Sequence, residues 1–102
     1  MVRQILDKLK KCIRHAKYSI DDREKNLRVL THYGYTVLDQ ESILLQLEYK
    51  DFKKYDEDRD CPDEGYWFFK TQYDGRVFYV KFKIIFISEE FAFIKSLHID
   101  GE

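Results

Sequence analysis

The sequence has few of the residues that mark metal-binding, secreted and phosphate-loop proteins. It contains two cysteines, one proline and four glycines in 102 residues. Cys12 and Cys61 form no CxxC pair, and no histidine lies at zinc-binding spacing, so neither a zinc site nor a disulfide framework is expected. The sequence also lacks a glycine-rich phosphate loop, a serine nucleophile elbow and an EF-hand calcium loop. We therefore expect no cofactor and no bound metal.

Long hydrophobic runs are also missing. The N-terminal residues lack the apolar core of a signal peptide, and no stretch is long enough to cross a bilayer. This predicts a cytoplasmic protein with no membrane partner. The length predicts a single domain over residues 1–102, and the hydrophobic content of 44% is sufficient for one modest core.

Charge is nearly balanced overall but unevenly distributed. The net charge of −1 says nothing about nucleic-acid binding. Residues 1–17 contain six basic residues and one aspartate, a net charge of +5, whereas residues 56–64 contain six acidic residues and one arginine, a net charge of −5. Such segments can present separate fields to different partners, although two solvated segments of opposite sign are the commoner situation.

Apolar periodicity predicts three helices in the first half of the chain. The first covers about 3–17, and the second covers about 22–33 after a cap at Asp21 or Asp22. The third covers about 40–47 after a cap at Asp39. The residues expected to face the core are Cys12 in the first helix, Leu27, Leu30 and Tyr33 in the second, and Ile43, Leu44 and Leu47 in the third.

The pattern changes to that of β-structure in the second half. Residues 50–65 are polar and contain the only proline, which predicts a long loop. Strands are expected at 66–73, 76–87 and 91–99, with a hairpin turn at Asp74-Gly75. Helices followed by an antiparallel meander predict an α+β fold, with the N-terminal helices packed on a twisted antiparallel sheet.

Alternation along the strands sorts their side chains into two faces. The residues expected to pack against the helices are Phe78, Val80, Phe82, Ile84 and Phe86 in one strand, and Phe91, Phe93 and Leu97 in the next. The other face then carries Tyr79, Lys81, Lys83, Ser96 and His98, and Lys53 and Lys54 of the long loop can reach its rim.

These polar residues suffice for cutting RNA without a metal. The 2′-OH of RNA can attack the adjacent phosphate if a histidine moves its proton and lysines stabilise the phosphate charge. A tyrosine can stack on a base or hold the phosphate. The set is not specific, because lysine and tyrosine are ordinary on the solvent face of an antiparallel sheet.

Family resemblance adds to this interpretation. The stretches that carry it are DDREKNLRVL at 21–30, SILLQLEYKDF at 42–52, DEDRDCPDEGYWFF at 56–69, DGRVFYVKFKI at 74–84 and IKSLHIDGE at 94–102. In order and spacing they resemble the MqsR-type toxins of bacterial toxin–antitoxin pairs. The resemblance implies a RelE-like fold, metal-independent cleavage of messenger RNA on the open face of the sheet, and an antitoxin partner with zinc-binding and DNA-binding parts.

The resemblance also implies roles for individual residues. The catalytic candidates are Lys54, Tyr79, Lys81 and His98, with His98 as general acid or base, the lysines on the phosphate and Tyr79 positioning the RNA. Further RNA-binding candidates are Lys53, Lys70, Arg76 and Lys83. By resemblance, Phe68 stands at the position where the family has a glutamine. Lys70 is displaced by one position from the lysine of relatives in this branch, which turns its side chain to the opposite face of the strand.

The sequence therefore favours an endoribonuclease toxin. Two alternatives remain open. The same sheet face, or the acidic loop, could serve a non-catalytic protein-interaction module, or the face could bind RNA without cutting it.

Overall fold

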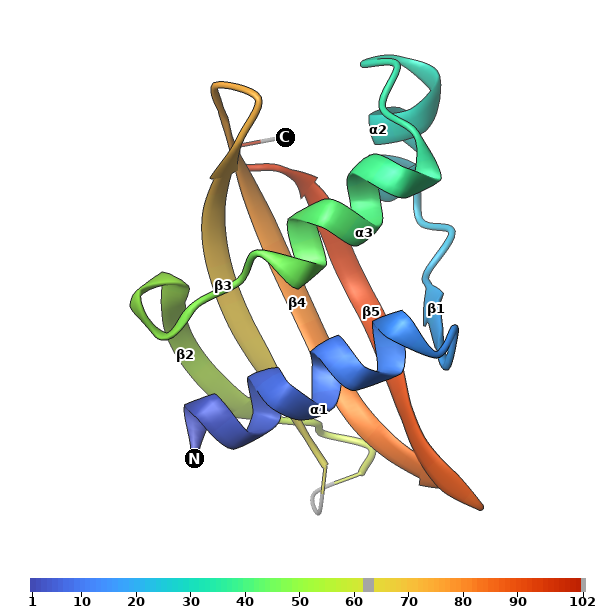
Figure 1. Cartoon of the computed structure of the whole chain (residues 1–102), viewed down its shortest axis with the longest axis vertical. Coiled ribbons are helices and arrows are strands. Elements are labelled where there is room, and N and C mark those ends of the chain that lie inside the picture. Colours follow the sequence, from blue (N-terminus) through green and yellow to red (C-terminus); the bar gives the residue numbers. More distant parts are fainter. Residues whose placement is uncertain (62–63, 102) are drawn as a thin grey trace.

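The computed structural model describes residues 1–61 and 64–101, and over these residues it forms helices packed on one face of a five-stranded sheet (Figure 1). The strand order is β1-β5-β4-β3-β2. All neighbouring pairs are antiparallel except β1 and β5, which are parallel. The predicted α+β class, with N-terminal helices on a mostly antiparallel sheet, is confirmed.

Helix α1 (Val2–Arg14) carries the predicted apolar stripe. Its buried residues are Leu6, Leu9, Cys12 and Ile13. The helix ends before residue 17 because Ala16 adopts a left-handed conformation, with φ 57°, and the backbone N–H of Lys17 donates to the carbonyl of Cys12. This turn leads directly into β1 (Tyr18–Ile20), a strand too short to predict from its sequence.

Helix α2 (Glu24–Thr31) is shorter than predicted and presents a different side to the core. It begins after Arg23, without a side-chain cap from Asp21 or Asp22. Its buried residues are Asn26 and Val29, whereas Leu27 is 45% exposed, so the expected inward position of Leu27 was wrong. The helix packs against β5, where the polar Asn26 has backbone partners that the apolar pattern did not reveal.

Helix α3 (Val37–Leu45) starts earlier than expected because the capping residue is Thr36. The Thr36 hydroxyl accepts a hydrogen bond from the backbone of Asp39, and the Asp39 carboxylate accepts one from the backbone of Thr36. Asp39 is therefore the third residue of a capping box and not the cap itself. The core positions Ile43, Leu44 and Leu47 are fully buried, as predicted.

The predicted loop over residues 50–65 contains a short 3₁₀ helix, η1 (Tyr49–Asp51), and a strand, β2 (Phe52–Glu57). The strand was missed because it lies at the sheet edge with almost every residue exposed, and so shows no apolar alternation. The remaining strands are β3 (Gly65–Tyr73), β4 (Arg76–Ile87) and β5 (Glu89–Ile99). Asp74 and Gly75 both have positive φ, 55° and 73°, which is the two-residue hairpin that the sequence predicted.

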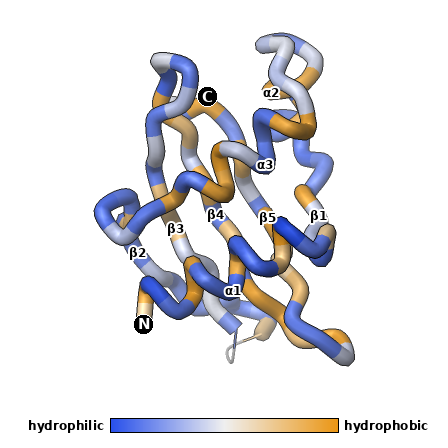
Figure 2. The backbone as a smooth tube through the Cα atoms, viewed as in Figure 1, coloured by the Kyte–Doolittle hydropathy of each residue, from blue (hydrophilic) through white to orange (hydrophobic). Residues whose placement is uncertain are grey.

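The core lies between the helices and the sheet. Phe69, Phe78, Val80 and Phe82 are fully buried there. Hydrophobic residues run along β4 and β5 under the helices and continue toward the free end of their hairpin (Figure 2). Phe86 was expected in the core but is 74% exposed, because the β4–β5 hairpin extends past α1 (Figure 1).

A β-bulge at Lys95 changes the alternation of β5. Lys81 pairs with Ser96 but the next residue, Phe82, pairs with Ile94, which leaves Lys95 as an extra residue. Before the bulge the helix-facing residues are Ala92 and Ile94, and after it Leu97 takes over. The expected core positions of Phe91 and Phe93 were therefore wrong, since both are only partly buried and pair with open-face positions of β4.

Asn26 of α2 supplies the hydrogen bonds of the bulge. Its amide nitrogen donates to the carbonyls of Asp21 and Lys95, at 2.9 and 3.0 Å, and its amide oxygen accepts from the backbone N–H of Leu97 at 2.9 Å. Strand β1 ends at Ile20, opposite Ile94, so the Asn26 side chain continues the pairing of the β5 edge. A buried amide thus takes the place of a strand backbone.

Candidate functional site

The face of the sheet opposite the helices brings most of the predicted catalytic residues together. In the strand register Tyr79 lies opposite His98, and Lys81 lies between Phe68 of β3 and Ser96 of β5. Lys54 of β2 lies opposite Phe68 from the other side. The bulge is required for this arrangement, because it turns Ser96 and His98 onto the open face while Ile94 and Leu97 fill the core.

Lys81 occupies the centre of this face without a carboxylate partner. Its ammonium lies 4.6 Å from the ring centroid of Tyr66 and 5.0 Å from that of Phe68, and it forms no ion pair among the described residues. Burial lowers the pKa of Lys81, and the nearby cations Lys95 and Arg23 lower it further. A half-buried cation without a counter-ion is a ready partner for an anion such as phosphate.

Arg23 and Lys95 join this face, although the sequence gave no reason to choose them. Arg23 precedes α2, and its guanidinium donates to the Ser96 hydroxyl at 2.9 Å. Lys95 is the bulged residue, and its ammonium lies 3.6 Å from the carboxylate of Asp21. Strict alternation places Lys95 on the helix side, so only knowledge of the bulge would have identified it.

Lys54 lies at the rim of the face, as the sequence predicted. Its ammonium is 4.6 Å from the ring centroid of Phe68 and 3.1 Å from the Asp56 carboxylate, and its side chain is more than half exposed. Lys53 is the extra residue at a register shift between Phe52 and Lys54, and it is exposed. Phe68 is buried, and its ring lies between the ammonium groups of Lys54 and Lys81.

Tyr79 and His98 form a tilted ring pair beside Lys81. Their ring centroids are 5.3 Å apart, and burial raises the pKa of the Tyr79 phenol. His98 is only 7% exposed, and its Nδ1 lies 3.0 Å from the carbonyl oxygen of Ile99. Because a carbonyl can only accept, this contact assigns the proton to Nδ1 and leaves Nε2 as the basic nitrogen of the neutral ring.

Lys83 lies on the same strand face as Lys81 but is ion-paired with two acidic residues. Its ammonium contacts the carboxylates of Asp58 at 2.8 Å and Glu64 at 3.0 Å, and its side chain is 11% exposed. These two carboxylates raise the pKa of Lys83 despite its burial. The expected RNA contact at Lys83 does not fit this geometry, because its charge is already neutralised by a loop distant in the sequence.

Two other predicted RNA contacts lie away from the centre. Lys70 is on the open face opposite Tyr79, but its ammonium pairs with Asp100 at 3.2 Å. Arg76 is on the helix side: its guanidinium donates to the Tyr35 hydroxyl at 3.0 Å and lies 5.0 Å from the Tyr33 ring centroid. Alternation with the buried Phe78 already places Arg76 on that side, so this RNA-binding candidate lies apart from the open face.

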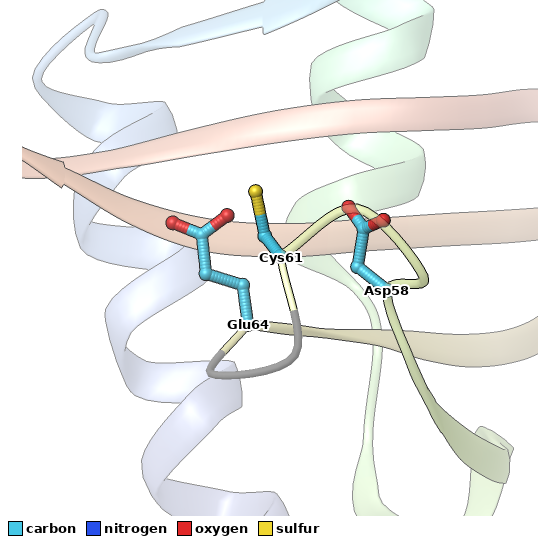
Figure 3. Close-up of side chains that lie close together, drawn as sticks. All are labelled: Asp58, Cys61 and Glu64. Carbon is cyan, nitrogen blue, oxygen red and sulfur yellow. The ribbon is translucent and has the colours of Figure 1, made fainter.

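The loop between β2 and β3 gathers three potential metal ligands. Side-chain atoms of Asp58, Cys61 and Glu64 lie within 4.8 Å of one another (Figure 3). The ammonium of Lys83 already contacts both carboxylates and is the main cause of the lowered pKa of Asp58. The cluster therefore serves as an anchor that holds the loop against β4, with a lysine in the place where a cation would bind.

A hollow of about 370 Å³ lies where the anchored loop meets the face. Lys81 and Lys95 line one side of it, residues 56–60 line the other, and the rings of Tyr66 and Phe68 also line it. Cations can bind phosphates while neighbouring aromatic rings stack on unpaired bases. This combination is the one that proteins use to bind single-stranded RNA.

Comparison with models of known protein families and with curated protein sequences found no match for this chain. In the part of the chain that the structure describes, no helix is both long and apolar enough to cross a membrane.

Proposed function

We propose that this chain binds single-stranded RNA on the open face of its sheet and cleaves it by attack of the 2′-OH on the adjacent phosphate. The observation that carries the proposal is the grouping of four cations, Arg23, Lys54, Lys81 and Lys95, around aromatic rings and beside the Tyr79–His98 pair. The resemblance to MqsR-type toxins of the RelE-like class supports the same activity and extends it to a toxin that acts on messenger RNA.

The groups on the face divide the reaction between them. Lys81 and Lys54 bind the scissile phosphate and stabilise the charge that builds on its oxygens. Tyr79 holds the nucleotide in line, and Nε2 of His98 accepts the 2′-OH proton, which the same ring can return to the leaving 5′-oxygen. The P–O5′ bond breaks as the 2′-oxygen bonds to phosphorus, which gives a 2′,3′-cyclic phosphate and a 5′-hydroxyl. The chain's own groups supply every proton transfer.

Cleavage of a labelled RNA in excess EDTA tests the proposal directly. The wild-type protein should give fragments that end in 2′,3′-cyclic phosphate, and His98→Ala and Tyr79→Ala should give none while keeping the fold. Lys11→Met, an exposed lysine on α1 over the opposite face, is the matched control and should cleave normally. If the purified protein neither cuts RNA nor slows growth when expressed alone, the proposal fails.

A second candidate is an RNA-binding protein without nuclease activity. The burial of His98 favours it, because only 7% of this residue reaches solvent, which limits the access of a substrate to its ring. RNA recovered intact after salt-sensitive binding would support this alternative.

The toxin role also implies a protein partner. By resemblance, an antitoxin with zinc-binding and DNA-binding parts would be encoded beside this gene. Co-expression of the neighbouring gene product should restore growth, and the two proteins should purify together. Growth arrest that no neighbouring gene relieves would contradict the toxin–antitoxin assignment without affecting the nuclease.

A further inference from the structure

The sheet has an open edge at β2. This strand is the last in the strand order, and β3 is its only neighbour among the described residues. The backbone N–H of Asp58, directly after the strand, donates to the carbonyl of Glu64 at 3.0 Å. Successive residues of an antiparallel strand direct their backbone groups to alternate sides. Tyr55 and Glu57 therefore point their N–H and C=O groups away from β3, where a further strand can pair with them.

The charges along β2 change sign at Tyr55. Lys53 and Lys54 precede this residue, Asp56 and Glu57 follow it, and all five residues are exposed. If two copies of the strand pair in antiparallel fashion about Tyr55, Lys54 lies opposite Asp56 of the second copy and Lys53 lies opposite Glu57. Opposite charges across a strand pair are stabilising and like charges are destabilising. A parallel pair about the same residue would instead place each lysine opposite its own copy.

Tyr55 provides an aromatic contact at the centre of such a pair. Its side chain lies on the helix side of the sheet, where its ring centroid is 4.6 Å from that of Trp67. The ring also covers Gly65, where any Cβ atom would collide with it. Tyr55 is nevertheless 44% exposed. Because facing residues of an antiparallel pair point to the same side, the Tyr55 rings of two copies would lie next to each other, a favourable cross-strand contact.

Lys54 and Asp56 lie on the other side of the strand and already form an ion pair. The ammonium and carboxylate are 3.1 Å apart, and the two side chains are 59% and 57% exposed. In the antiparallel pair each ammonium would lie between the Asp56 carboxylate of its own copy and that of the second copy. The ion pair within the strand would thus be extended into a group of four alternating charges, without being broken.

We propose that two copies of this chain pair edge to edge through β2, in antiparallel orientation and centred on Tyr55. The two five-stranded sheets then form one continuous sheet, with both open faces on the same side. Charged residues usually protect an edge strand from pairing. Here their order opposes a parallel pair and favours this antiparallel one.

The dimer should be weak because the paired segment is short. The register shift between Phe52 and Lys54 ends the regular part of the strand. An interface of this kind lies in the smallest size class, so we expect a dissociation constant between about 10 μM and about 1 mM. This inference goes beyond the proposed function and does not depend on RNA binding.

Charge reversal at the facing positions tests the dimer by sedimentation equilibrium of the purified protein. Lys54→Glu and Asp56→Lys each place like charges opposite one another at two points. Either variant alone should raise the dissociation constant at least about tenfold, which corresponds to about 1.4 kcal/mol. An equimolar mixture of the two variants faces opposite charges again, and should form a heterodimer with an affinity within about threefold of the wild type. Lys11→Glu and Asp7→Lys, at exposed positions of α1, are the matched controls and should leave dimerisation unchanged.

NMR of a mixture of isotope-labelled and unlabelled protein tests the register. The Cα atoms of residues that face each other without mutual hydrogen bonds approach most closely in an antiparallel pair. An NOE between Hα of Lys54 in one copy and Hα of Asp56 in the other is therefore expected. A wild-type protein that stays monomeric at about 1 mM would overturn the proposal. So would a dimer that neither reversal weakens, or variants whose mixture fails to associate. None of these outcomes bears on RNA cleavage, which the open face of one copy can carry out.

Discussion

Lys81 and Lys83 lie two residues apart on the same face of the same strand, yet their surroundings have opposite signs. Lys81 is bordered by the rings of Tyr66 and Phe68 and by other cations, which together with burial lower its pKa. Lys83 is enclosed by two carboxylates, which raise its pKa. Strand position makes the two equivalent, so their different roles come from residues that are distant in the sequence.

The comparison shows that one lysine of this face is available to bind a ligand, whereas the other stabilises the fold. Lys81 has a charge without a partner, which weakens the folded state slightly and favours binding of an anion. The charge of Lys83 is neutralised by its two carboxylate partners. These ion pairs stabilise the folded state and leave Lys83 unable to bind an anionic ligand. The β5 bulge lies between them: Lys81 faces Ser96 across the strands and Lys83 faces Phe93.

Replacing Lys81 by methionine should give the largest effect. RNA cleavage should fall by about 100-fold or more, as it does when one charge-stabilising group is removed from an active site. Stability should stay the same or rise slightly, because a desolvated ammonium is removed. Single-turnover cleavage and urea denaturation measure the two quantities, and a stability loss that parallels the activity loss would contradict the proposed division.

Breaking the bulge should disrupt the surroundings of Lys81 and leave the carboxylate partners of Lys83 in place. Asn26→Leu leaves the Lys95 carbonyl and the Leu97 N–H without partners, which should cost about 2–4 kcal/mol of unfolding free energy. Val29→Ala, a buried apolar change on the same helix, is the control, since it should lower stability but keep the cross-strand NMR contacts between Lys81 and Ser96. Retention of these contacts in Asn26→Leu would show that the bulge does not depend on the amide.

Removing the Lys83 anchor should have a smaller effect on stability. Lys83→Met leaves Asp58 and Glu64 without their cation, and the melting temperature should fall by about 5 °C, as the loss of one ion-pair cluster in a domain of this size allows. The loss should be larger at pH 7 than at pH 3. The lowered pKa of Asp58 means that its contribution is present above its unfolded pKa and is lost as the pH falls through its folded pKa. A pH-independent loss would argue against the anchor.

The smallest expected signal is the titration of the two lysines themselves. NMR of the side-chain Nζ groups should show Lys81 losing its proton below the ordinary lysine pKa of 10.5 and Lys83 above it. The stability that Lys83 contributes is complete below 10.5 and is lost as the pH rises through its raised pKa. Lys81 has the opposite sign, since its penalty disappears at alkaline pH. Equal pKa values for Lys81 and Lys83 would contradict the proposed difference between their surroundings.

Some of this architecture follows from the sequence, because local patterns determine it. The stripe of α1, the Asp74-Gly75 turn and the alternation of Phe78, Val80 and Phe82 each depend on neighbours a few residues away. The position of Tyr79 and Lys81 on the open face follows from the same alternation. These features were predictable because a helix or strand with a regular apolar pattern has only one side that can face the core.

The rest depends on partners that no local pattern reveals. Strand β2 is polar because it lies at the edge, so its pairing with β3 leaves no apolar signature. Lys83 was expected to bind RNA because nothing in β4 indicates that residues 58 and 64 fold back onto it. Arg23 reaches the face only through its contact with Ser96, which itself depends on the bulge.

The bulge at Lys95 also changes what a one-residue deletion would do. Ile94 and Leu97 both face the core although three positions separate them, which a regular strand does not permit. Deleting residue 95 would restore regular alternation while keeping Arg23, Tyr79, Lys81 and His98 in the chain. Ile94 and Leu97 would still face the core, and Ser96 and His98 would still face the open side, because only the extra residue is removed. A deletion at this one place would therefore keep the order of the two faces and remove only the Lys95 ammonium, together with the carbonyl that accepts a hydrogen bond from Asn26.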